Sequence, residues 1–325
     1  MKIAVMAAGG VGGYFGARLA AAGYDVSFVA RGSHLEAMRR DGLRIESGLG
    51  DLKLDPLKAT GDPGEIGPVD VVMFAVKLWD TEEAAAACRP LVGDGTAVIS
   101  FQNGIGAIDV LSRVLGPEHA LGGTAHIASV IAGPGTIRHT GVLARLTFGE
   151  TDNRRSPRLE AFLEACAKAG VDAEIADDMK RAVWEKFIFL TALSGTTTVA
   201  RRPLGPILAD PDLRRAFLSA MEETAALARE KGVDIEDGVI DRLMTFAEEL
   251  PGEMKSSMLR DLEGGKRLEV EWLSGGVSLM SRDLGLASPV NDTIFAALKP
   301  YAGGSAGRRE AGNSPGGTRQ GDQKC

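Results

Sequence analysis

The chain has 325 residues, with 37 lysines and arginines against 44 aspartates and glutamates, so its formal net charge is −7. This acidic balance excludes a dedicated nucleic-acid binder, because such a protein concentrates positive charge against phosphates. Apolar residues make up 44% and charged residues 25%, which is the mix of a globular protein and not of a disordered chain. A chain of this length buries about three quarters of its unfolded surface, and roughly two domains are expected.

Cysteine usage and hydropathy indicate the compartment. The cysteines are odd in number, widely spaced and without a C-x-x-C pair; they are Cys88, Cys166 and Cys325. A disulfide framework or a structural zinc site is therefore not expected. No run approaches the ~18 apolar residues of a membrane span. The apolar stretch after Lys2 resembles a secretory signal, but five glycines between Gly9 and Gly16 interrupt it. We expect a cytoplasmic protein with no membrane contact.

The first half of the chain alternates short apolar runs with helical patterns. Strands are predicted at 3–7, 25–30, up to residue 46, 69–76 and 97–101, and helices at 11–22, 34–40 and 81–91. Further strands are predicted at 120–130, 135–139 and 143–149. Such alternation is typical of βαβ units, and strands that are apolar on both faces are typical of a parallel sheet covered by helices.

From about residue 177 the alternation gives way to long helical patterns. They are predicted at 179–199, 212–231, 237–249, 268–283 and 293–299. The fold class is therefore α/β, with an N-terminal Rossmann-type doubly wound parallel sheet and a C-terminal all-helical domain. We expect the sheet domain at 1–176 and the helical domain at 177–300. Residues 301–325, rich in Gly, Ser, Arg and Gln, are expected to be a disordered tail.

A glycine-rich loop joins the first predicted strand to the first helix. In the pattern G-x-G-x-x-G, Gly9 and Gly12 take the second and third places, and Ala7 stands in the first. Glycines there let backbone N–H groups at a helix N-terminus approach a pyrophosphate. Because the loop follows the first strand of a βαβ unit, we expect it to bind a dinucleotide. A tight turn that binds no ligand is the alternative.

The end of the second predicted strand indicates which dinucleotide. A carboxylate there holds the ribose 2′-hydroxyl of NAD, whereas a cation accommodates the 2′-phosphate of NADP. The strand ends in Ala30-Arg31, with no carboxylate in that place. We therefore expect NADPH, with Arg31 at its 2′-phosphate; an ordinary surface arginine is the alternative.

Two further segments follow strands whose carboxyl ends line a cofactor crevice in this class of fold. Lys77 follows the strand at 69–76, and Asn103 follows the strand at 97–101. Each residue has an alternative interpretation that involves no ligand: Lys77 as a solvated lysine, and Asn103 as part of an Asn-Gly turn. Together with the glycine loop, they predict groups that hold ribose, nicotinamide or substrate oxygens.

Polar groups in the helical half complete the candidate site. Lys186 lies within an apolar helical pattern, where a lysine either extends to solvent or serves a function such as proton donation. The hydroxyls of Ser256 and Ser257 are candidates for binding a carboxylate, with a helix N-cap as the alternative for Ser256. Glu269 follows them.

The motifs together resemble the ketopantoate reductases (2-dehydropantoate 2-reductases). The resemblance rests on the glycine loop, Val-Lys-x-Trp at 76–79, Gln-Asn-Gly at 102–104, Trp-Glu-Lys at 184–186, Ser-Ser-Met-Leu-x-Asp at 256–261 and Glu269. It covers about residues 1–300 and implies NADPH-dependent reduction of 2-dehydropantoate to (R)-pantoate in pantothenate and coenzyme A biosynthesis. It further implies a small 2-oxo acid as the only partner, apart from a possible homodimer.

Roles follow from the resemblance position by position. Lys186 is implied to be the proton donor to the substrate ketone. Cofactor contacts are implied for Gly9, Gly10, Val11, Gly12, Arg31, Lys77, Asn103, Ala128 and Glu269. Substrate contacts are implied for Asn103, Lys186, Ser194 and Ser257. No metal is expected.

The sequence departs from the family at three positions. Family members have asparagines four and eight residues after the lysine, and a third further on, where this chain has Leu190, Ser194 and Leu204. Losing amides removes hydrogen-bond partners for a polar substrate and makes the pocket more apolar. Two alternatives therefore stay open: a reductase of a more apolar 2-oxo acid, and a binding protein that senses NADP(H) without turnover.

Overall fold

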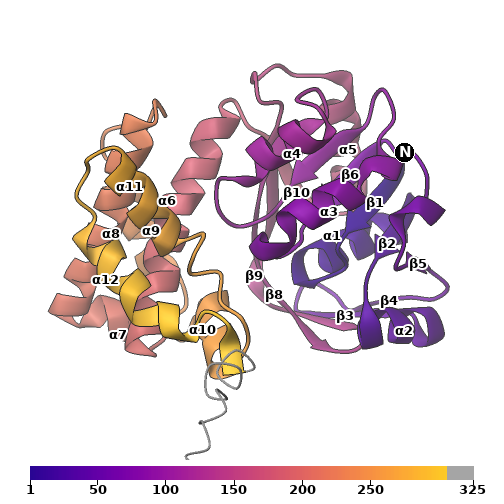
Figure 1. Cartoon of the computed structure of the whole chain (residues 1–325). Coiled ribbons are helices and arrows are strands. Elements are labelled where there is room, and N and C mark those ends of the chain that lie inside the picture. Colours follow the sequence, from indigo (N-terminus) through magenta and orange to yellow (C-terminus); the bar gives the residue numbers. More distant parts are fainter. Residues whose placement is uncertain (306–325) are drawn as a thin grey trace, which may run out of the picture. The chain divides into compact units, whose positions relative to one another are not determined.

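A ten-stranded, mostly parallel sheet forms the centre of the first of two units in the computed structural model, which describes residues 1–305 (Figure 1). This unit comprises 1–190 and 224–241, and the second comprises 191–223 and the described residues from 242 onward. The domain boundary expected at residue 176 stays a prediction.

The strand order is β4-β3-β9-β8-β7-β6-β1-β2-β5, and β10 pairs with β9. The pairs β3–β4 and β8–β9 are antiparallel and the other pairs are parallel. The strands are β1 (Lys2–Met6), β2 (Asp25–Val29), β3 (Leu43–Ser47), β4 (Leu52–Leu54), β5 (Lys58–Thr60), β6 (Val71–Phe74), β7 (Ala97–Ser100), β8 (Ala120–Gly133), β9 (Thr136–Gly149) and β10 (Asp172–Ile175). The predicted Rossmann-type sheet is confirmed.

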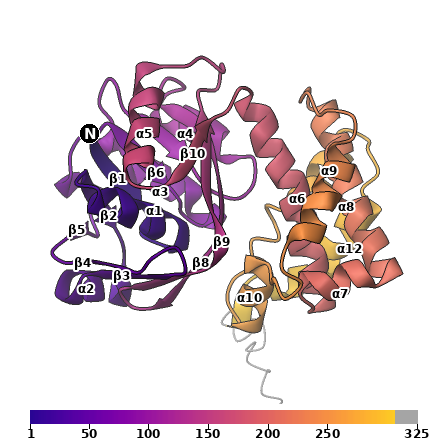
Figure 2. The same cartoon turned by 180° about the vertical axis from the view of Figure 1, so that it is seen from behind.

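Helices pack on both faces of this sheet. Alternate residues of β1 point to opposite faces, so Ile3 and Val5 join one apolar cluster and Ala4 and Met6 join another. The first cluster lies under α1 (Gly10–Ala21) and α5 (Pro157–Lys168), and the second under α3 (Thr81–Ala87) and α4 (Ala107–Leu115). Figure 2, which views the chain from behind, brings α5 to the front. The short helix α2 (Gly32–Asp41) follows β2.

The second unit is helical, as predicted. Helix α6 (Met179–Ala200) begins in the first unit and ends in the second. The later helices are α7 (Leu204–Ala209), α8 (Pro211–Glu230), α9 (Val239–Glu249), α10 (Ser257–Glu263), α11 (Ser274–Asp283) and α12 (Pro289–Leu298). The end of α8 and the start of α9 belong to the first unit. Within this unit Gly195 leaves room for Ile294, since a Cβ there would lie 2.9 Å from its Cδ1. Among residues 1–305, no helix combines the length and apolarity that a membrane crossing requires.

Three predicted elements differ from the structure. The strands predicted at 135–139 and 143–149 are one strand, β9, because only residues 141–143 leave the pairing with β8. Gly141, with φ of +82°, allows the chain to bulge there and then resume. The helix predicted from residue 268 begins only at Ser274.

The predicted tail and cysteines are only partly described. Residues 301–305 of the tail include Ala302, whose carbonyl accepts from the N–H of Leu268 at 2.9 Å, and residues 306–325 lie outside the described part. Cys88 and Cys166 are free and buried, and burial raises the pKa of each thiol to about 12. Both thiols therefore stay protonated at neutral pH.

Candidate active site

Gly12 is a glycine because α1 packs tightly against the first strand. A Cβ at this position would lie 2.3 Å from the carbonyl oxygen of Ala7 and 2.8 Å from Cγ1 of Val5. Real side chains do not tolerate such distances. The third glycine of the motif thus serves close helix–strand packing, as it does in dinucleotide-binding turns.

At Gly9, by contrast, no packing contact within the protein requires a glycine. Its φ of −77° and ψ of −164° suit any residue, and a Cβ there would meet no atom within 4 Å. The open space lies at the N-terminus of α1, where the N–H groups of Gly10, Val11 and Gly12 come before Gly13, the first residue whose N–H donates within the helix. A backbone left open in front of helix N–H groups fits the pyrophosphate of a dinucleotide.

His34 braces the glycine loop, although no sequence motif marks it. Its Nε2 lies 3.0 Å from the carbonyl oxygen of Ala8, and its Nδ1 accepts from the N–H of Gly135 at 3.0 Å. A backbone N–H requires a lone pair on Nδ1, so the proton sits on Nε2 and donates to Ala8. Burial lowers the pKa of His34, which favours this neutral ring.

Arg31 stands at the end of β2, where the sequence places it. It is the N-cap residue of α2, and its side chain is 63% exposed. The guanidinium lies 3.6 Å from the carboxylate of Glu83, which is also exposed. Because an exposed pair of this kind is weak, a phosphate dianion at the strand end can compete for Arg31.

Gln102 organises the ends of β6 and β7. Its amide Nε2 donates to the carbonyl of Val76 at 3.0 Å and to the hydroxyl of Thr81 at 2.9 Å. These bonds hold the backbone on either side of Lys77 against the segment that carries Asn103. Lys77 itself is exposed, with Nζ 5.5 Å from the ring centre of Trp79.

Lys186 and Asn103 meet directly. The Lys186 Nζ donates to Oδ1 of Asn103 at 3.3 Å, and both residues are half-buried. Asn103 follows β7, whereas Lys186 lies 83 residues later on α6. The structure thus joins the two residues that were predicted to touch the reacting part of the substrate.

His126 is a second histidine that sequence reasoning missed. It lies on β8, and the positive charge of Lys186 disfavours protonation of its ring and lowers its pKa. Ala128, a predicted cofactor contact, follows two residues later and therefore points to the same face of the strand. A lone histidine in a strand carries no motif, so only the fold reveals its position.

The remaining predicted residues belong to the second unit. Ser194 is fully buried on α6, and Glu269 is 6% exposed. Ser256 is the N-cap of α10, and its hydroxyl oxygen accepts from the N–H of Leu259 at 3.1 Å. The N-cap role given as the alternative for this serine is therefore confirmed. Ser257 begins that helix and is exposed.

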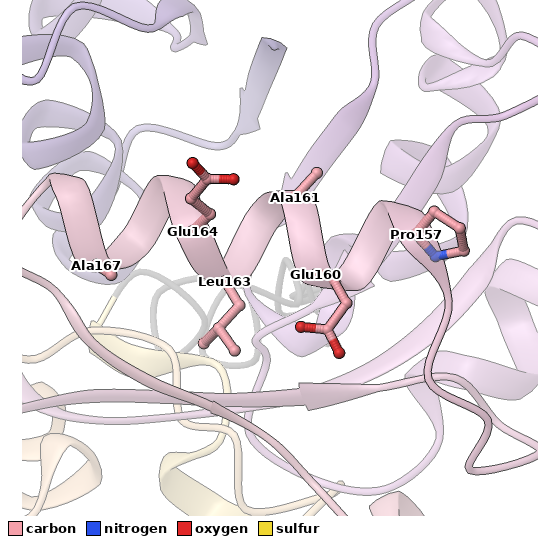
Figure 3. Close-up of a pocket in the computed structure, with 6 residues that line it drawn as sticks. All are labelled: Pro157, Glu160, Ala161, Leu163, Glu164 and Ala167. Atoms are coloured by element: carbon pink, nitrogen blue, oxygen red, sulfur yellow. The ribbon is translucent and has the colours of Figure 1, made fainter.

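A hollow along α5 lies apart from these groups (Figure 3). Its lining comes from one helix: Pro157, Glu160, Ala161, Leu163, Glu164 and Ala167. A ligand site needs polar groups that converge from several elements, and a single helix face does not supply them. We assign no function to this hollow.

A Rossmann sheet with an open glycine loop and a lysine–asparagine pair indicates an oxidoreductase as the class of protein. The family model "Ketopantoate reductase PanE/ApbA" matches residues 3–153, and its C-terminal counterpart matches residues 178–302. The chain belongs to the ketopantoate reductase family.

Individual relatives span nearly the whole chain. An uncharacterized oxidoreductase, YkpB, of Bacillus subtilis is 34% identical over 301 residues, covering 93% of this chain and 99% of the relative. A crystal structure of 2-dehydropantoate 2-reductase from Geobacter metallireducens is 33% identical, with a TM-score of 0.86 and coverage of 92% and 99%. D-mandelate dehydrogenase, in a ternary structure with NADH and anilino(oxo)acetate, shares the fold at a TM-score of 0.85 and 18% identity, with coverage of 93% and 98%.

Proposed function

We propose that the chain catalyses the NADPH-dependent reduction of 2-dehydropantoate to (R)-pantoate. The observation that carries the proposal is the contact of 3.3 Å between Lys186 and Asn103, in the unit that also holds the glycine loop. A proton donor held beside a dinucleotide site is what the reduction of a ketone requires.

The cofactor would be held at the carboxyl ends of β1 and β2. The amides of Gly10, Val11 and Gly12 suit the pyrophosphate, and open space over Gly9 admits it. Arg31 suits a 2′-phosphate, and no acidic residue takes its place at the strand end. By the family resemblance, the remaining cofactor contacts would come from Lys77, Asn103, Ala128 and Glu269.

The reaction needs a hydride and a proton. Bound NADPH supplies the hydride, which would add to C2 of the 2-oxo acid and leave NADP⁺. Lys186 would donate an ammonium proton to the ketone oxygen as the carbonyl bond becomes a C–O single bond. Before that step its positive charge stabilises the developing alkoxide. The neutral amine then regains a proton from water.

Asn103 orients this proton donor. Its Oδ1 accepts one N–H of the Lys186 ammonium, which helps to fix the direction of Nζ. The bonds that Gln102 makes to Val76 and Thr81 hold the segment carrying Asn103 in place. Asn103 and Gln102 therefore act by positioning.

A second candidate is a reductase of a more apolar 2-oxo acid, and Leu190 favours it. Leu190 lies one turn after Lys186 on the same side of α6 and is partly exposed, so it presents methyl groups beside the ammonium. By the family resemblance, an amide would stand there. A pocket that loses an amide binds a hydroxylated substrate less well and tolerates an apolar one better.

Oxidation of NADPH by purified protein separates these candidates. We would measure kcat/KM for 2-dehydropantoate, 2-oxoisovalerate and phenylglyoxylate, each with NADPH and with NADH. The first candidate predicts the highest kcat/KM for 2-dehydropantoate with NADPH. A higher value for either apolar acid would overturn the pantothenate assignment, and no turnover with any acid would overturn the reductase itself.

A further inference from the structure

The face of β8 that carries His126 is defined by its neighbours. Ala125 and Ile127 pack into the apolar cluster that lies under α1 and α5. Because successive strand residues point to opposite faces, His126 and Ala128 point to the other side. His126 thus shares a strand face with a predicted cofactor contact.

Helix α6 begins beside β8. A Cβ on Gly122 would lie 2.4 Å from Met179, the first residue of α6, and Gly123 lines a small cavity together with Val183. Lys186 lies about 10 Å beyond Met179 along the helix. His126 lies about 13 Å beyond Gly122 along the strand. The charge of Lys186 also acts on His126, whose pKa it lowers.

The ring of His126 is neutral at physiological pH. Burial, together with the charges of Lys186 and Arg145, lowers its pKa to about 4. Arg145 is its partner across the β8–β9 pair. A neutral imidazole carries one N–H donor and one acceptor, so His126 can bind an oxygen without adding a charge beside the Lys186 ammonium.

His126 differs from the other histidines in its hydrogen bonding. His34, His119 and His139 each bond to protein through a ring nitrogen. The ring of His126 makes no hydrogen bond to any other residue within 1–305. His126 is half-buried, and ring nitrogens that make no bond to the protein are available to a ligand.

We propose that His126 binds the substrate of the proposed reductase by donating its ring N–H to the carboxylate of the 2-oxo acid. The carboxylate adjoins the ketone carbon, so a donor that neighbours Lys186 on a second element is placed to reach it while Lys186 serves the ketone oxygen. His126 would supply a substrate contact in a chain whose α6 has Leu190 and Ser194 in place of amides. This inference rests on the proposed reduction of a 2-oxo acid.

Two variants separate hydrogen bonding from packing. His126→Phe keeps a ring but removes the donor, and we expect KM for the 2-oxo acid to rise about 10- to 100-fold, as for a lost hydrogen bond to a charged group. His126→Gln restores a neutral N–H and should recover most of that loss. The Kd for NADPH should stay within about twofold of wild type in both, because a substrate contact does not hold the dinucleotide. His119→Gln, in which the altered ring bonds only to the carbonyl of Thr96 among described acceptors, is the control.

Carboxylate-free ketones test which oxygen is bound. We would compare 2-dehydropantoate with its lactone, and 2-oxoisovalerate with its methyl ester. His126→Phe should raise KM for the acids and leave KM for the lactone and the ester nearly unchanged. An equal change for acids and carboxylate-free ketones, or an unchanged KM for the acids, would overturn the inference. So would a loss of NADPH binding that accompanies the loss of substrate binding.

Calorimetry tests the inference without requiring turnover, because it measures substrate binding directly. The NADP⁺-bound protein is titrated with 2-dehydropantoate and with 2-oxoisovalerate. Binding by wild type that His126→Phe weakens about tenfold or more supports the contact even if no reduction occurs. Binding that is equal in both proteins, or absent in wild type, contradicts it. Failure of the reductase proposal would instead appear as binding without NADPH oxidation.

Discussion

Two glycines of the same loop should respond to alanine in opposite ways. In Gly12→Ala the new Cβ would stand 2.3 Å from the carbonyl oxygen of Ala7, about 1 Å short of the 3.4 Å at which ordinary contact begins. Backbone oxygen cannot rotate away as a side chain can, so α1 must shift from β1. Overpacking of this kind costs about 1–3 kcal/mol of unfolding free energy.

Gly9→Ala should leave the apo protein at least as stable as wild type. Its φ of −77° suits alanine, and the added methyl meets no atom within 4 Å. Alanine also restricts the unfolded chain more than glycine does, which should add about 0.4–1 kcal/mol to the free energy of unfolding. If the open space receives the pyrophosphate, the methyl occupies it, and NADPH affinity should fall at least tenfold, about 1.4 kcal/mol.

Urea unfolding without ligand and fluorescence titration with NADPH measure the two effects separately. Gly95→Ala is the matched control, since a Cβ there also meets nothing and Gly95 lies before β7 at the other end of the strand. Gly95→Ala should bring the same small gain in stability and leave NADPH affinity unchanged. A Gly9→Ala protein that binds NADPH as tightly as wild type would refute the reasoning. The loop would then be interpreted as a tight turn that binds no ligand.

Three further substitutions test other parts of the account. Arg31→Asp should weaken NADPH at least tenfold more than NADH in fluorescence titrations, and equal effects on both would exclude a 2′-phosphate contact. Burial raises the pKa of Glu150, but hydrogen bonds from Arg158 and Ser156 outweigh it and hold that pKa below its usual value. Its contribution to stability is therefore complete above the usual carboxyl pKa and is lost as pH falls through the lowered one. In urea melts Glu150→Gln should cost about 2 kcal/mol at neutral pH and remove that pH dependence, and an unchanged acid profile would contradict this reasoning. Leu190→Asn should raise kcat/KM for 2-dehydropantoate relative to 2-oxoisovalerate at least tenfold, and an unchanged ratio would remove Leu190 from the determinants of specificity.

Local signals predicted the sheet and most of the long helices. The run that forms β1, the glycines after it and the next apolar run specify a β-α-β unit without reference to the rest of the chain. The bulge at 141–143 could not be predicted in this way, because a glycine such as Gly141 is found both where a strand ends and where it continues after a bulge. No helix is predicted at 157–168, although Pro157 stands at its first turn and its apolar residues recur at helical spacing.

The site was predictable only where a motif marks it. The glycine loop, Arg31 and Asn103 follow strand ends, and their positions come from the sheet alone. The contact of Lys186 with Asn103 and the effect of its charge on His126 depend on where α6 packs against the sheet, which no local pattern encodes. Residues that act through long-range packing therefore appear only in the structure.

The role of Lys186 is the claim on which the mechanism depends. The direct test compares single-turnover and steady-state NADPH oxidation by Lys186→Ala with oxidation by Lys180→Ala, with the 2-oxo acid that wild type reduces best. Lys180 lies on the same helix, but its ammonium donates to the carbonyls of Lys231 and Gly232. We predict that Lys186→Ala lowers kcat about 10²- to 10⁴-fold with an unchanged Kd for NADPH, whereas Lys180→Ala keeps both. A Lys186→Ala protein with near-normal kcat would contradict the mechanism.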